Sequence, residues 1–129
     1  MHAQQHQACD SPFFSFDDPS PAALREIAAS CEHRPVAMLF YNRAYHKEVL
    51  GDLRLLTGLH TYGTSEDQIR YEQSRIFIAL AEELARRAWE SGSCSGIASL
   101  NAAYDQAIET VEYTIKGYNL LIGGVAGEE

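Results

Sequence analysis

The chain has 129 residues, 46% of them hydrophobic and 22% charged, which is ordinary usage for one globular domain. A domain of this length can bury a core without disulfides or metals. The formal net charge of −8 repels phosphate backbones and disfavours general nucleic-acid binding. No apolar run is long enough to span a bilayer, and the polar start MHAQQHQACD lacks the features of a signal peptide. We therefore expect a cytoplasmic protein with neither a nucleic-acid nor a membrane partner.

The cysteines are Cys9, Cys31 and Cys94, an odd number without CxxC or other ligand spacing. This usage predicts reduced thiols rather than a disulfide framework. No cofactor is expected from any motif in the chain.

The first part of the chain, residues 1–18, is expected to be a flexible arm that carries a cluster of phenylalanines. The cluster comprises Phe13, Phe14 and Phe16. A helix start follows, because Ser20 can cap free amides and Pro21 suits the first helical turn. The first helix is predicted to run from Pro21 to about Cys31.

The four prolines all precede position 36, so residues 36–122 lack the strongest helix breaker. A second helix is predicted from about 35 to 60 and a third from about 64 to 91. A glycine just past the end of each, Gly63 and Gly92, is the stop signal. A fourth helix is predicted from about 95 to 123.

The short connections between these helices favour antiparallel neighbours. The predicted fold is therefore an all-α, antiparallel four-helix bundle over residues 19–124, with a short first helix, three long helices and a tail at 125–129.

Apolar residues placed about 100° apart mark a predicted core stripe on each long helix. The second helix has Met38, Tyr45, Val49, Leu53 and Leu56. The third has Ile69, Ile76, Phe77, Leu80 and Leu84. The fourth has Ile97, Leu100, Tyr104, Ile108, Val111, Ile115, Tyr118 and Ile122.

The third helix carries a second apolar side, opposite its predicted core stripe, with Tyr71, Ile78 and Trp89 as its main residues. A helix that is apolar on two sides is usually packed between two partners. Either the first helix or the segment 13–16 covers this side, or it forms a homodimer or partner interface. Aromatic residues are typical anchors of such interfaces.

Polar residues on the predicted stripes offer a possible ligand pocket, made by Asn42, His46, His60 and Glu112. His46 and His60 are fourteen residues apart, roughly 21 Å along one helix, so they cannot share a metal ion. No metal site is therefore predicted.

A short motif joins Arg54, five intervening residues, His60, one further residue and Tyr62. It resembles the Arg–His motif of HEPN-type ribonucleases, which are also small helical proteins. The resemblance covers nine residues and implies that Arg54 and His60 would act on a scissile phosphate, with two sites paired across a dimer. The spacer begins with Leu55, where that family often has a polar residue.

Two functions stay open from the sequence. The first is a small cytoplasmic protein-interaction module, such as an adaptor, chaperone, inhibitor or immunity-type protein, that self-associates or binds another protein and has no catalytic residue. The second is a helical-bundle enzyme or ligand-binding protein that uses the polar residues of the second helix. The acidic charge and the second apolar side of the third helix favour the first.

Overall fold

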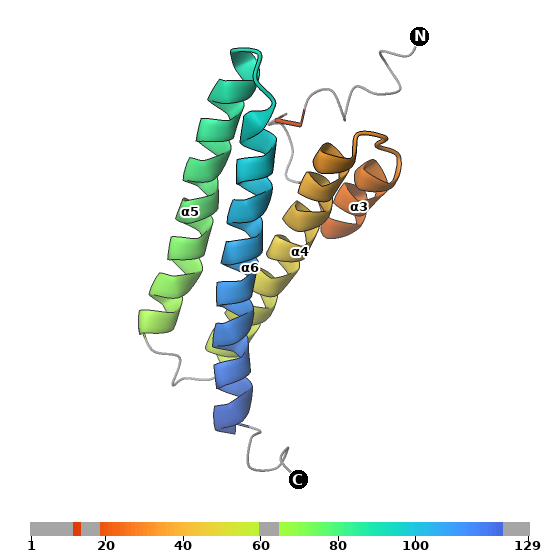
Figure 1. Cartoon of the computed structure of the whole chain (residues 1–129). Coiled ribbons are helices and arrows are strands. Elements are labelled where there is room, and N and C mark those ends of the chain that lie inside the picture. Colours follow the sequence, from red (N-terminus) through yellow and green to blue (C-terminus); the bar gives the residue numbers. More distant parts are fainter. Residues whose placement is uncertain (1–11, 14–18, 60–64, 123–129) are drawn as a thin grey trace.

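A computed structural model of the chain describes residues 12–13, 19–59 and 65–122, and the side chains among them outside 56–67 and 118–122. The helices are α3 (Pro21–Ala29), α4 (Arg34–Leu59), α5 (Ser65–Glu90) and α6 (Ser95–Ile122), and this part of the chain contains no strand. The prediction of an all-α four-helix bundle is confirmed (Figure 1). The expected tail at 125–129, and the expected arm apart from Pro12 and Phe13, lie outside the described residues.

Local signals set the helix ends as the sequence predicted. Ser20 Oγ accepts a hydrogen bond from the Ala23 amide at 3.1 Å, and Pro21 occupies the first turn of α3. At the end of α5, Gly92 has a φ of 94°, which glycine adopts without steric cost. The Ser93 amide then reaches back to the carbonyl of Ala88 at 2.8 Å, so the turn closes α5 and starts α6 at once.

The helices pack in the order α3, α4, α6, α5. Helix α3 lies against α4, α4 against α6 and α6 against α5, whereas α4 and α5 touch much less (Figure 1). The bundle is therefore open, and α5 is an edge helix with α6 as its main neighbour.

The core lies chiefly between α4 and α6. Its fully buried members include Val36, Leu39, Phe40, Leu53, Ile97, Leu100 and Val111. On α6 the predicted stripe is confirmed from Ile97 to Val111, and Ile115 is partly buried. The side chains of Tyr118 and Ile122 are outside the description.

On α4 the predicted stripe is only half correct. Val49 and Leu53 are buried, but Met38 and Tyr45 are 47% and 42% exposed. Leu39 and Phe40 fill the core instead, one and two positions after Met38. The buried face is thus turned away from the predicted one near the start of α4, where α3 packs as well. The side chain of Leu56 is not described.

On α5 the assignment of the two faces is wrong. The predicted core stripe is exposed, while Ile78 and Ala85 are buried and Tyr71 and Trp89 pack partly buried against the core. The physical reason is the close approach of α5 to α6. A Cβ added to Gly96 would lie 2.8 Å from Ala85 Cα, so only small side chains fit where the two helices cross.

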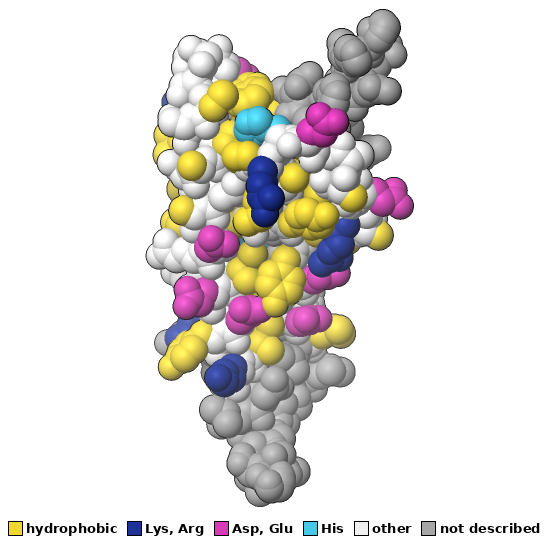
Figure 2. All heavy atoms as spheres, turned by 45° about the vertical axis from the view of Figure 1, so that its right-hand side comes forward, with side chains coloured by type: hydrophobic (Ala, Val, Ile, Leu, Met, Phe, Trp, Pro, Cys, Tyr) yellow, Lys and Arg dark blue, Asp and Glu magenta, His cyan; other side chains and the backbone are white. Residues whose placement is uncertain are grey.

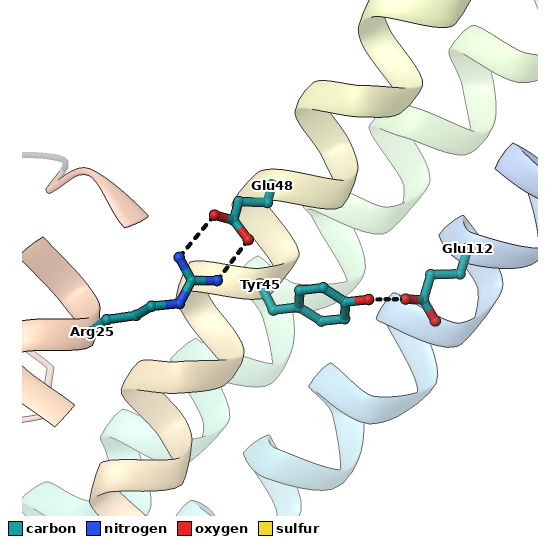
Figure 3. A network of polar contacts seen from close by, with 4 residues as sticks. All are labelled: Arg25, Tyr45, Glu48 and Glu112. Atoms are coloured by element: carbon teal, nitrogen blue, oxygen red, sulfur yellow. Dashed lines mark hydrogen bonds and ion pairs between the residues drawn. The ribbon is translucent and has the colours of Figure 1, made fainter. Parts of the chain in front are cut away.

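Cross-helix contacts hold α4 on both sides (Figure 3). Arg25 of α3 donates two hydrogen bonds to Glu48, at 2.8 and 2.6 Å, and Tyr45 donates one to Glu112 of α6. The hydrogen bond from Arg25 lowers the pKa of Glu48. Because these side chains are exposed, their main effect is to fix orientation rather than to add stability.

The cysteines differ from expectation. Cys31 is disulfide-bonded and Cys94 is a free, exposed thiol, so the prediction of reduced thiols is wrong for Cys31. An odd count without recognisable spacing does not exclude one bridge. Among the described residues, no helix combines the length and apolar character that crossing a bilayer requires.

Candidate functional site

The outer face of α5 carries a row of large apolar side chains that no part of the described chain buries. We call this row the α5 ridge; it consists of Ile69, Ile76, Phe77, Leu80 and Leu84. Their exposed fractions run from 42% for Phe77 to 68% for Leu84. Together they leave on the order of 400 Å² of apolar surface in water, as much as the largest patches of monomeric proteins, which are often functional.

The ridge residues follow the period of a helix-packing surface. Ile69 and Ile76 are seven residues apart, and Leu80 and Leu84 follow at intervals of four. At 3.6 residues per turn these positions fall in one stripe along α5, where side chains pack between those of a neighbouring helix. The ridge therefore has the form of a helix contact that lacks its second helix.

The charges beside the ridge are balanced within α5. Glu72 pairs with Arg75 at 2.8 Å, and Glu83 pairs with Arg87 at 3.0 Å. Residues 68–90 contain four arginines and four glutamates and so carry no net charge, against −8 for the whole chain. Glu66 and Asp67 precede this stretch at the start of α5, so the balance holds along the ridge from residue 68 onward.

A shallow groove separates the ridge from α6. It has a volume of about 230 Å³ and its walls include Phe77 and Gln73 of α5 and Gln106 and Thr110 of α6. Gln106 and Thr110 therefore face the same side of the molecule as the ridge.

On this side α6 presents mostly short side chains. We call this row the α6 shelf; it consists of Ser99, Ala102, Ala103, Gln106 and Thr110. All are exposed except Ala103, which is half-buried. Large side chains on α5 thus stand next to a low surface on α6.

One face of the molecule has a mixed surface. Figure 2 shows a face on which apolar side chains are interrupted by acidic and basic ones, with several acids in its lower half. Met38 and Tyr41 of α4 are also exposed, at 47% and 43%, but they lie on a different helix from the α5 ridge.

The three residues predicted to bind a partner point into the chain. Ile78 is 6% exposed, and Tyr71 and Trp89 pack against the core. Phe13 meets Trp89 edge to face, with ring centroids 6.2 Å apart, so the start of the segment 13–16 does cover Trp89. A second apolar side on this helix was correctly predicted, but the exposed one is the α5 ridge.

The three described residues of the predicted pocket, Asn42, His46 and Glu112, make separate contacts. Asn42 donates to Asn101 Oδ1 at 3.0 Å, Glu112 accepts from Tyr45, and His46 is buried. His60 lies outside the described residues. Within those that are described, no group of three His, Cys, Asp or Glu could hold a metal ion.

His46 belongs instead to a buried polar contact between three helices. Its Nε2 lies 2.9 Å from Ser74 Oγ, and its ring packs edge to face on Tyr104 with centroids 5.4 Å apart. Burial lowers the pKa of His46 to about 4, although the carboxylate of Glu82 opposes this shift. The imidazole is therefore neutral at physiological pH.

The network continues through Glu82, which accepts hydrogen bonds from Tyr104 and from Arg43, both at 3.0 Å. Burial, together with the Glu82 charge, raises the pKa of Tyr104. Ser74 and His46 have the atoms of a nucleophile and base; both side chains are buried, and Ser74 also lines the groove between α5 and α6. Sequence reasoning missed Ser74 because it lies on the face of α5 assigned to the outside.

Comparison with protein-family models, with curated proteins and with solved structures finds no match for this chain. The function is therefore argued from geometry alone.

Proposed function

We propose that this chain is a helical protein-interaction module and that its contact face is the α5 ridge. The observation that carries the proposal is the exposure of five large apolar side chains in one stripe of an edge helix. Burying about 400 Å² of apolar surface corresponds to on the order of 10 kcal/mol before the costs of association. A partner helix laid along the ridge would gain much of that free energy.

The cytoplasmic location predicted from the sequence is not part of this proposal, because a disulfide at Cys31 is more typical of an oxidising compartment. We do not propose a catalytic function. Asn42, His46 and Glu112 make separate contacts, and Arg54 is an exposed residue of α4 whose proposed partner His60 is outside the described residues.

Photo-crosslinking in the cell of origin tests the proposal. A photoreactive phenylalanine replaces Leu80 of the ridge, and in a matched control it replaces Leu55 of α4, since both leucines are 62% exposed. We expect an adduct of one defined mass from position 80 and none from position 55. Equal labelling from both positions, or none from position 80, would contradict the proposal.

A further inference from the structure

We propose that the occupant of the α5 ridge is a second copy of this chain, in a two-fold dimer in which the ridge of each copy lies on the α6 shelf of the other. This inference rests on the proposed function and adds the identity of the partner and the geometry of the contact.

The area of the α5 ridge favours a contact that extends onto α6. The ridge offers on the order of 400 Å², while a standard stable interface buries about 800 Å² on each partner. The α6 shelf lies beside the ridge and faces the same way, so the two together approach the required area. A contact with the ridge alone would leave the shelf uncovered and would fall short of it.

The shape of this face also favours a second copy, because α5 carries large side chains and α6 carries short ones. A two-fold axis that runs along the groove between α5 and α6 places α5 of one copy over α6 of the other. It also makes each helix antiparallel to the one that it covers, as in four-helix bundles. The large side chains of the α5 ridge then meet the short side chains of the α6 shelf in both halves of the dimer, which is the self-complementarity that a two-fold contact needs.

The register of the two helices supports this fit. Gly96 lies against Ala85, and Ala107 lines the same groove as Ser74. Continuing this register, Leu80 is level with Asn101, next to Ala102 of the α6 shelf. An axis parallel to the helices keeps these levels, so the 62%-exposed Leu80 would lie over the methyl group of Ala102 in the second copy.

In the same register Ile76 is level with Asp105, next to Gln106, and Ile69 is level with Glu112, next to Tyr113, which is 78% exposed. Tyr113 therefore gives the far end of the contact an aromatic anchor of the kind that interfaces favour.

The charge along the ridge favours a second copy over a basic partner. A protein with a net charge of −8 repels its own copies, and a basic partner would be drawn to its acidic regions. The ridge lies where the charge is balanced, because Glu72 and Arg75 neutralise each other, as do Glu83 and Arg87. This local balance lowers the repulsion that a second acidic copy meets along the ridge.

Sedimentation velocity of the purified full chain tests the dimer. We expect a two-chain mass for the natural sequence, and a dimer weakened at least about a hundredfold by Leu80→Glu, which would bury a charge in the contact. The control Leu55→Glu, at a position of equal exposure, keeps the two-chain mass.

A second pair of variants tests the shelf. Ala102→Trp should also weaken the dimer, because it raises the low side of the surface, whereas Ala22→Trp on the exposed face of α3 should not. Helical circular dichroism that matches the natural chain shows that each variant is folded. A one-chain mass for the natural sequence, or a dimer indifferent to Ala102→Trp, would overturn the proposal.

Cys94 reports the direction of the axis. This free thiol lies in the turn between α5 and α6, and an axis along the groove brings the two turns to the same end of the dimer. Mild oxidation should then link two chains through Cys94, and the link should be lost in Cys94→Ser and in Leu80→Glu. A dimer in which α5 pairs antiparallel with α5 puts the turns about 40 Å apart, so a dimer without this link would overturn the geometry.

The two proposals fail in different ways. If the purified chain sediments as one chain while position 80 still gives an adduct with another protein in the cell, the dimer is wrong and the interaction module stands. If position 80 gives no adduct and the chain is monomeric, both are wrong.

Discussion

Acid should destabilise this protein through His46. Its pKa is about 4 in the folded chain against 6.5 for an ordinary histidine, so between these values the unfolded state binds a proton that the folded state does not. Stability therefore rises with pH in this window, is fully present above 6.5, and stops falling below about 4. Lowering the pH from about 8 to about 5 should cost about 2 kcal/mol from this residue alone.

Urea unfolding followed by circular dichroism at the two pH values measures this loss. His46→Gln keeps an amide that can bond Ser74 but removes the titrating group, so its loss of stability over the same range should be smaller by about 2 kcal/mol. The exposed His33 supplies the control, and His33→Gln should behave like the natural chain. An undiminished pH dependence in His46→Gln would refute the assignment of a buried, neutral imidazole.

Two further predictions concern packing. Gly51→Ala should stabilise the chain by up to about 1 kcal/mol, because Gly51 lies inside a helix with nothing within 4 Å of an added Cβ. Gly96→Ala should instead lower the free energy of unfolding by about 1–3 kcal/mol, because the added Cβ collides with Ala85. The midpoints of urea unfolding measure both changes. Trp89→Ala should destabilise the chain by about 3 kcal/mol because it removes packing from the core. Leu84→Ala, at a position 68% exposed, should stay within about 0.5 kcal/mol when the chain is dilute enough to be monomeric, and equal effects of the two variants would mean that the faces of α5 are misassigned.

The helices were predictable because their ends depend on local chemistry. Ser20 and Pro21 can start a helix in any fold, and Gly92 can end one, so these signals need no knowledge of the tertiary structure. The α6 stripe was predictable for a similar reason, since from Ile97 to Ile115 the large apolar residues of that helix other than Tyr113 lie on one side.

The size of the side chains did not predict which face of α5 is buried. Hydrophobic periodicity selects the side with the largest side chains, which is the ridge. The fold instead buries the side that allows close approach, and Ala85 facing Gly96 decides this. Only the pairing of α5 with α6 reveals that constraint, and the same pairing decides that Ser74 faces His46.

One face of helix α5 packs against the rest of the chain, and the other face is exposed. Its inner face contributes short side chains at the crossing with Gly96 and two polar contacts, Ser74 with His46 and Glu82 with Arg43. None of these contacts involves a ridge residue. Substitutions on the ridge should therefore change association without unfolding the chain, which is the separation that an interaction surface requires. In chain dilute enough to be monomeric, a ridge substitution that also lowered the free energy of unfolding would instead show that the outer face supports the monomer.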